Sequence, residues 1–134
     1  MDLTQISLAD FLGEDDQEYS PAGILPRDEL VPPGSGLKFP VLKSHGGLRI
    51  VLLNDFGDVA AVNKDGNEAG FYSGNSLVVH DEYRGNGLGT ALALYAHDHR
   101  DELPNSRSLT EGGRNTLQAA WEVANGHRQS SWWP

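Results

Sequence analysis

The sequence predicts a single α/β domain with a mixed, mostly antiparallel sheet, a central helix after a glycine-rich loop, and a second helix that packs beside it. Three observations support this fold class. Short β-like runs, separated by turn residues, fill residues 37–80. The glycine-rich stretch RGNGLGT then occupies residues 84–90. Two segments with apolar residues at helical spacing follow this stretch, so the strands precede the helices along the chain.

Length and composition are those of one globular domain. The chain has 134 residues, of which 38% are hydrophobic and 22% are charged, and domains of roughly 100–150 residues are common. The absence of cysteine excludes disulfides, thiolate zinc sites and a cysteine nucleophile. The first twenty residues lack the basic start and apolar core of a signal peptide, and no run approaches the roughly 20 apolar residues of a membrane span. We therefore expect a cytoplasmic protein without a membrane partner.

The N-terminal segment, residues 1–36, differs from the rest of the chain in charge. It holds eight acidic residues and one basic residue, so −7 of the formal charge of −9 lies here. One short amphipathic helix is expected within residues 3–13, and prolines and glycines then stop any longer element. We interpret the segment as an acidic arm before a domain of residues 37–134. The arm is either a solvated face or a docking surface for a basic partner, and the negative charge argues against nucleic-acid binding.

Four runs are candidates for strands of the sheet. They are LKFPVLK at 37–43, LRIVLLN at 48–54, GDVAAVNKDGN at 57–67 and AGFYSGNSLVVH at 69–80. The first is weak because Pro40 interrupts it, and the second is the best because branched apolar residues fill it. Asp65-Gly66 is a good hairpin turn, and Gly74 inside the last run indicates a bulge or a close backbone approach. The last three strands should form an antiparallel meander.

Two helices are predicted after the glycine-rich stretch. In the first, apolar residues fall at i, i+3, i+4 and i+7 from Leu88 to Tyr95, which gives one apolar stripe. This helix should end near His99. The second has the same spacing from Leu117 to Ala124 and should stop at Gly126. Between them, a weak strand is expected near residues 106–109.

The stretch RGNGLGT has the properties of a diphosphate-binding loop. A helix that begins near Gly87 presents backbone N–H groups without internal partners in its first turn, and its dipole favours an anion there. Glycine at positions 85, 87 and 89 removes the Cβ atoms that would keep phosphate oxygens away. Arg84 adds a full positive charge. The alternative is a glycine-rich turn without a ligand.

Neither common nucleotide-binding motif fits this loop. A mononucleotide P-loop needs Lys-Ser/Thr after its last glycine, whereas Thr90 follows Gly89 directly. A dinucleotide fingerprint needs a third glycine five residues after Gly85, and Thr90 occupies that position. That fingerprint also belongs to parallel β-α-β units, whereas the strands before this loop are predicted to be antiparallel.

Arg84, Gly87 and Gly89, which follow a strand containing Val79, resemble the pattern Q/R-x-x-G-x-G/A of the GNAT (GCN5-related N-acetyltransferase) superfamily. In that family the pattern opens the central helix and holds the pyrophosphate of acetyl-CoA. The resemblance implies a GNAT-like sheet and acetyl-CoA as the acyl donor. It implies cofactor contacts from Leu77, Val78 and Val79 along the pantetheine arm, from Arg84, Gly85, Asn86, Gly87, Leu88, Gly89 and Thr90 at the pyrophosphate, and from Asn115 on the second helix.

The chain departs from the family's pattern after the central helix. The family's second helix usually carries a tyrosine that protonates the departing thiolate, and Glu122 stands at that place. His127 follows Gly126 where the family usually has phenylalanine. The family's sheet ends with two further strands, whereas only the eight residues HRQSSWWP follow the predicted stop of this helix. The resemblance therefore covers about residues 37–127.

Acid–base groups for amine acetylation are sought near the predicted cofactor loop. His80 has the most suitable unperturbed pKa for a base, near 6.5, and Glu82 is close to it in sequence. Glu122 would serve as a proton relay. The alternative for His80 and Glu82 is an exposed loop residue, and the alternative for Glu122 is a solvated helix residue. The histidines lack the spacing of metal ligands, so we predict no metal site.

The sequence thus predicts an acyltransferase that moves an acetyl group from acetyl-CoA to an amine of a small molecule or a protein. The alternative is a catalytically degenerate protein of the same fold that captures a partner through its acidic arm. A homodimer is also expected, because a sheet edge left open by the short C-terminus needs a cover. The pair Trp132-Trp133 either packs back on the domain or lies at or near this contact.

Overall fold

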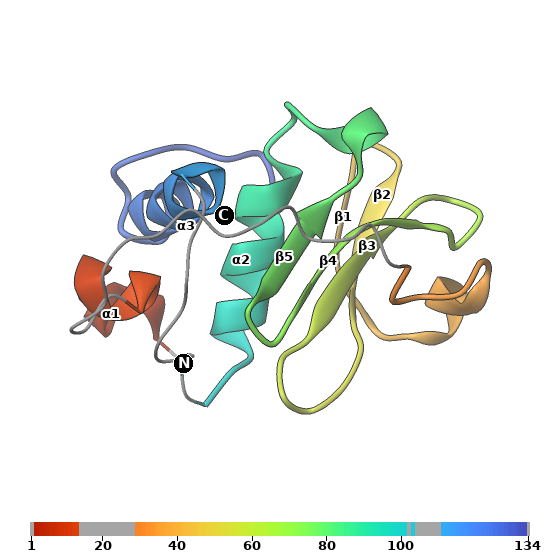
Figure 1. The fold of residues 1–134 in the computed structure, drawn as a ribbon, viewed down its shortest axis with the longest axis horizontal. Helices are drawn as coiled ribbons and strands as arrows, with labels where there is room; N and C mark the ends of the chain where they lie inside the picture. Colours follow the sequence, from red (N-terminus) through yellow and green to blue (C-terminus); the bar gives the residue numbers. More distant parts are fainter. Residues whose placement is uncertain (1, 14–28, 102, 104–110, 134) are drawn as a thin grey trace.

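The computed structural model describes residues 2–13, 29–101, 103 and 111–133 of the chain. Within them, five strands form one sheet, with helices gathered on one of its faces (Figure 1). The strands are β1 (Val41–His45), β2 (Leu48–Leu52), β3 (Val59–Val62), β4 (Glu68–Ser73) and β5 (Ser76–Val79). The helices are α1 (Leu8–Leu12), α2 (Leu88–Asp98) and α3 (Glu111–Ala124), with short 3₁₀ turns η1 (Leu3–Gln5), η2 (Ser35–Lys38) and η3 (Asp81–Tyr83). The fold is therefore α/β.

The sheet is an antiparallel meander in the order β1-β2-β3-β4-β5. The predicted hairpin at Asp65-Gly66 is confirmed, because Gly66 has a φ of 82° in the turn between β3 and β4. The prediction of one strand over residues 69–80 is wrong. Ser73 pairs with Ser76, so Gly74 and its neighbour form a two-residue hairpin turn that divides this run into β4 and β5.

The two long helices lie where helical periodicity predicts them. The apolar stripe from Leu88 to Tyr95 faces the core, and α2 ends at Asp98. α3 ends at Ala124, after which Gly126 adopts a φ of 78°. The amide of His127 donates to the carbonyl of Glu122 at 2.8 Å, which satisfies one of the last carbonyls of the helix. The weak strand predicted near residues 106–109 lies outside the described residues.

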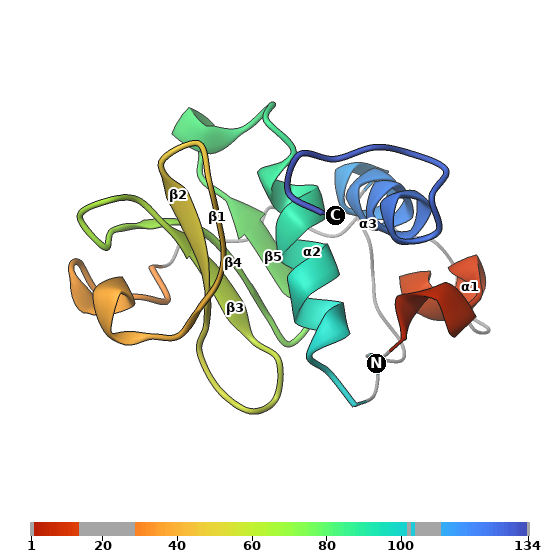
Figure 2. The ribbon, with the colours of Figure 1, turned by 180° about the vertical axis from the view of Figure 1, so that it is seen from behind.

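The elements form layers on both faces of the sheet. α2 packs on β3, β4 and β5, α3 packs on α2, and α1 packs on α3; the turned view shows the same succession (Figure 2). On the opposite face, Val31 and Gly36 lie against the sheet. A Cβ built on Gly36 would stand 2.5 Å from Cγ1 of Val62, so only glycine permits this close approach of η2 to β3.

The described part of the segment 1–36 is packed as part of the domain. Leu3, Phe11 and Leu12 are buried in the main core with residues of α2 and α3. Trp121 of α3 donates its indole N–H to the carbonyl of Ile6 at 2.7 Å. The predicted short helix within residues 3–13 is present as η1 and α1. Most of the acidic run predicted to form a docking arm, residues 14–28, lies outside the described residues.

The C-terminal tail packs back on its own chain. Trp132 is buried, with 2% of its surface exposed, and its ring meets His45 edge-on at a centroid distance of 5.1 Å. The hydroxyl of Tyr95 donates to the carbonyl of Trp132 at 2.6 Å. Trp132 therefore packs on its own domain, which is the first of the two interpretations of the tryptophan pair. The homodimer itself stays a prediction.

Candidate functional site

The loop between β5 and α2 forms the centre of the site. η3 follows β5, and the chain then passes through Gly85 and Gly87, which have φ angles of 86° and 80°. Residues other than glycine rarely adopt this left-handed backbone conformation, so the path of the loop requires glycine at both positions. Gly87 is the N-cap of α2, and the side chain of Asn86 accepts a hydrogen bond from the amide of Leu88 at 3.2 Å. The loop therefore turns sharply and delivers the chain directly into the first turn of α2.

A cleft of about 480 Å³ opens beside this loop. β5, η3, the loop, the first turn of α2 and the first turns of α3 form its walls. The lining residues are Leu77, Val79, Tyr83, Arg84, Gly85, Gly87, Leu88, Gly89, Thr90, Gly112, Gly113 and Thr116. The cleft thus has an apolar wall along the strand and a wall of glycines and hydroxyls at the helix ends.

Two helix N-termini face this cleft. α2 contributes its first residues, and α3 contributes Gly112, Gly113 and Thr116. The helices come close here, since a Cβ on Gly89 would stand 3.2 Å from Cγ2 of Thr116. Each helix N-terminus carries a partial positive charge. Their convergence makes one end of the cleft favourable for an anion.

Arg84 supplies a full positive charge to the same cleft. Its Nε donates to the carbonyl of Val79 at 3.1 Å and lies 3.4 Å from Oδ1 of Asp81. These contacts hold the base of the guanidinium, while 68% of the side chain remains exposed. Because an exposed ion pair is weak, Asp81 does not prevent Arg84 from meeting an anion.

The outer edge of β5 also faces the cleft. β5 is the edge strand of the described sheet. The amide of His80 donates inward to Ala69 at 2.9 Å, so by strand alternation the backbone groups of Leu77 and Val79 point away from β4. The carbonyl of Val79 accordingly accepts from Arg84 on that outer side. The strand therefore offers backbone donors and acceptors to a ligand that runs along it.

The structure brings most of the predicted cofactor residues together. Those that line the cleft are Leu77, Val79, Arg84, Gly85, Gly87, Leu88, Gly89 and Thr90. Val78, Asn86 and Asn115 do not line it. Val78 packs on the opposite face of the sheet, Asn86 supports the loop from within it, and Asn115 is exposed on α3.

Four lining residues were not predicted from the sequence: Tyr83, Gly112, Gly113 and Thr116. Tyr83 is the last residue of η3 and directly precedes Arg84. The other three residues belong to α3, and helical periodicity alone does not predict which residues of a helix face the cleft. The glycine pair at the start of a helix with a strong apolar stripe was the available indication, because glycine is unfavourable in helices.

The structure places His80 away from the cleft. It directly follows β5, on the face opposite Leu77 and Val79, and only 3% of its surface is exposed. Its Nε2 lies 2.9 Å from Oε1 of Glu68, whose side chain is 1% exposed. The other carboxylate oxygen accepts from the amide of Val31 at 2.7 Å. Glu68 of β4 therefore connects His80 with the segment before η2.

The two predicted carboxylates also lie outside the cleft lining. Glu82 is exposed on η3. Glu122 lies on α3, with its Oε1 3.4 Å from Nη2 of Arg128. Among the described cleft-lining residues, Tyr83 and Arg84 are the only ones with titratable side chains.

No family model, no curated protein and no solved structure matches the chain. Among the described residues, no three or more His, Asp or Glu side chains gather closely enough to hold a metal ion. In the same part of the chain, no helix has the length and apolar character needed to cross a membrane.

Proposed function

We propose that the cleft binds acetyl-CoA through its diphosphate and that the protein transfers the acetyl group to an amine. One observation carries this proposal: the left-handed glycines at 85 and 87 place the N-terminus of α2 beside the N-terminus of α3, with Arg84 at the same cleft. Such an arrangement suits a diphosphate, because backbone N–H groups, two helix dipoles and one guanidinium all favour negative charge. The family resemblance of the loop supports acetyl-CoA as the source of that diphosphate.

The wall along β5 suits the rest of such a cofactor. Leu77 and Val79 are apolar and line the cleft, while their backbone groups point to the open edge of the strand. A pantetheine arm carries amides that pair with a strand edge, as extended peptides do. A thioester on this arm would meet an outward N–H group of β5, which polarises its carbonyl.

The reaction needs few groups from the protein. The neutral amine attacks the thioester carbonyl, the C–S bond breaks, the thiolate takes up one proton, and the amine nitrogen releases one. Three lining residues carry hydroxyls: Tyr83, Thr90 and Thr116. They offer hydrogen bonds to the phosphates or to the departing thiolate.

Isothermal titration of the full chain with acetyl-CoA tests the binding step. Gly87→Val is expected to lower affinity at least 30-fold, because its side chain would project at the mouth of the cleft. Gly47→Val is the matched control: Gly47 has the same φ of 80° and the same open surroundings, but lies in the β1–β2 turn. Both variants place valine at the same positive φ, and only Gly87 lines the cleft. No heat of binding at millimolar acetyl-CoA would contradict the proposal.

A second candidate function is a binding protein that holds the cofactor without turnover. It is favoured by the position of His80, Glu82 and Glu122 outside the cleft lining. A thiol-trapping assay for released CoA with a panel of amines separates the two functions. The chain has no cysteine, so the trapping reagent gives no background from the protein. Release with at least one amine supports the transferase, and tight binding without release supports the binder.

A further inference from the structure

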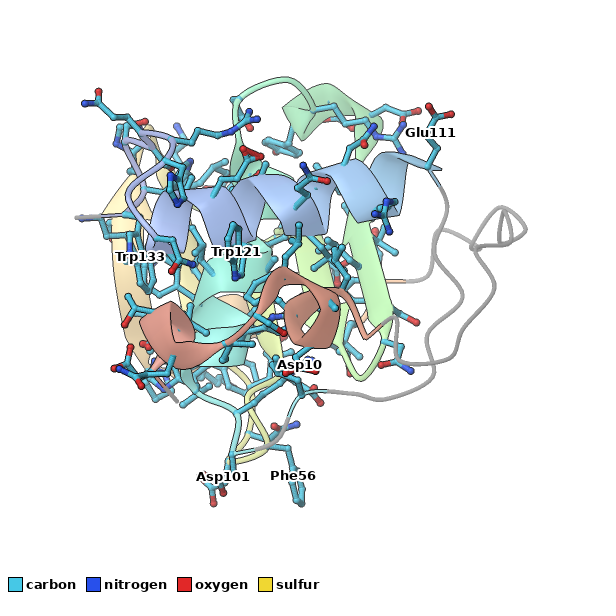
Figure 3. All side chains as sticks on the ribbon, turned by 90° about the vertical axis from the view of Figure 1, so that its left-hand side faces the viewer. Asp10, Phe56, Asp101, Glu111, Trp121 and Trp133 are labelled. Atoms are coloured by element: carbon cyan, nitrogen blue, oxygen red, sulfur yellow. The ribbon has the colours of Figure 1, made fainter. Side chains whose placement is uncertain are left out.

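Phe56 is the most exposed large apolar side chain of the described residues. Its exposed fraction is 81%, against 53% for Leu37 and 49% for Val41. It lies in the turn between β2 and β3. Figure 3 shows Phe56 and Asp101 projecting together from one end of the molecule, while Glu111, which begins α3 beside the cleft, lies at the other end. This surface is therefore separate from the candidate cofactor site.

The turn that carries Phe56 is held rigidly. The side chain of Asn54 accepts hydrogen bonds from the amides of Phe56 and Asp58, at 2.9 and 3.3 Å. Its amide group donates to Oδ2 of Asp58 at 2.8 Å. Gly57 packs against α2, where a Cβ would stand 2.5 Å from Cγ of Arg100. These contacts fix the backbone on both sides of Phe56.

Asp58 and Arg100 connect this turn to its two neighbours. Oδ1 of Asp58 accepts from the amide of Gly74 at 3.0 Å and lies 3.5 Å from Nη2 of Arg100. Arg100 is 4% exposed, and its Nη1 donates to the carbonyl of Gly74 at 3.0 Å. The β2–β3 turn, the β4–β5 turn and the end of α2 therefore form one preorganised surface, which lowers the entropy lost on binding.

The charge around Phe56 is negative. Asp55 precedes it and is exposed, and Asp101 is exposed just beyond α2. The neighbouring cation, Arg100, is buried and placed against Asp58. The C-terminus of α2 adds a partial negative charge at this end. The surface consequently offers a hydrophobic anchor flanked by carboxylates.

We propose that this surface, defined by Asp55, Phe56 and Asp101, docks a basic polypeptide segment that inserts an apolar side chain beside the Phe56 ring. Aromatic anchors dominate binding energy at many interfaces, and the flanking carboxylates select Lys and Arg by charge. A second copy of this chain fits poorly, because both surfaces and both chains, at −9 each, carry negative charge. An anionic membrane is disfavoured for the same reason.

A peptide array tests this proposal with the full chain and without any cofactor. The probes are synthetic 12-residue peptides whose net charge ranges from −4 to +6, each with and without aromatic or branched apolar residues. Binding should concentrate on basic peptides that contain apolar residues. Phe56→Ser should weaken binding to the best peptide at least 10-fold, and the double variant Asp55→Asn/Asp101→Asn should reduce both affinity and its salt dependence. Leu37→Ser, at another exposed apolar residue, should bind like the wild type.

Backbone NMR with the best peptide locates the contact. Changes in backbone chemical shift that are confined to residues 54–58 and 98–101 support the proposal, and changes elsewhere overturn it. It is also overturned by an array without preference for basic peptides, or by equal binding of Phe56→Ser. Self-association or adsorption to vesicles containing one third phosphatidylserine, if lost in Phe56→Ser, would assign the surface to a second copy or to lipid instead. None of these results depends on acetyl-CoA.

Discussion

Nε2 of His80 lies 2.9 Å from Oε1 of Glu68, in a pair that is almost completely buried on the sheet face opposite the cleft. The second carboxylate oxygen of Glu68 accepts from Val31. One acid therefore satisfies groups from two segments far apart in sequence. The contact with Glu68 indicates a structural role for His80. A substitution of Glu68 therefore tests how much this pair stabilises the segment before η2.

Glu68→Ala should lower the free energy of unfolding by about 3 kcal/mol, because it leaves buried donors of His80 and Val31 without their acceptor. Urea unfolding followed by circular dichroism measures this change. Glu82→Ala is the control: Glu82 is exposed, and such substitutions usually stay within about 0.5 kcal/mol. Equal stability of the two variants would contradict the role given to Glu68.

Asp58 should make the protein sensitive to acid. Partial burial alone would raise the pKa of Asp58, but hydrogen bonds from Asn54 and the Gly74 amide outweigh it, and the pKa lies below its ordinary value of 3.8. A carboxyl whose pKa is lowered by folding stabilises the protein above its unfolded pKa and loses this contribution as the pH falls through the folded pKa. Asp58→Asn should therefore be less stable than the wild type at pH 6, and the difference should shrink below about pH 4. A difference that is constant from pH 6 to pH 3 would contradict this.

Gly70→Ala should push β5 away from β4. A Cβ at this position would stand 2.6 Å from the carbonyl oxygen of Val78, and such overpacking costs about 1–3 kcal/mol. Because β5 is a wall of the cleft, the proposal that this cleft binds acetyl-CoA predicts a lower affinity for it in this variant. Gly112→Ala gives the contrast for stability: it has open space around it in α3, and alanine in a helix gains up to about 1 kcal/mol over glycine. Thermal unfolding should move in opposite directions for the two variants.

A chain that ends at Gln129 should unfold at a lower temperature than the intact chain. It lacks the buried Trp132 and the acceptor of the Tyr95 hydroxyl, and loss of a buried tryptophan costs about 3–5 kcal/mol. Light scattering of both chains also tests the predicted homodimer. A monomer in both cases, with an unchanged melting temperature, would contradict both the role of the tail and the dimer.

The sequence by itself determined the elements whose pattern is local. Helical spacing located α2 and α3, Asp65-Gly66 located one hairpin, and the glycine-rich loop was placed between a strand and a helix. These features depend on interactions within a few residues, so one sequence is enough to predict them. The division of residues 69–80 into β4 and β5 was not predicted. Gly74 inside a strand pattern indicates a bulge or a close backbone approach, whereas Gly-Asn is also a common hairpin turn.

Only the tertiary structure decided which residues meet. The face of β5 follows from the register that the Gly74 turn sets, and a shift of one residue would exchange the faces of Val79 and His80. The packing of α3 on α2 brings Thr116 rather than Asn115 to the cleft. Phe56 is apolar, yet its side chain is exposed in a turn that Asn54 holds by hydrogen bonds. Sequence patterns are read over neighbouring residues, whereas these outcomes depend on contacts between segments that are distant in the chain.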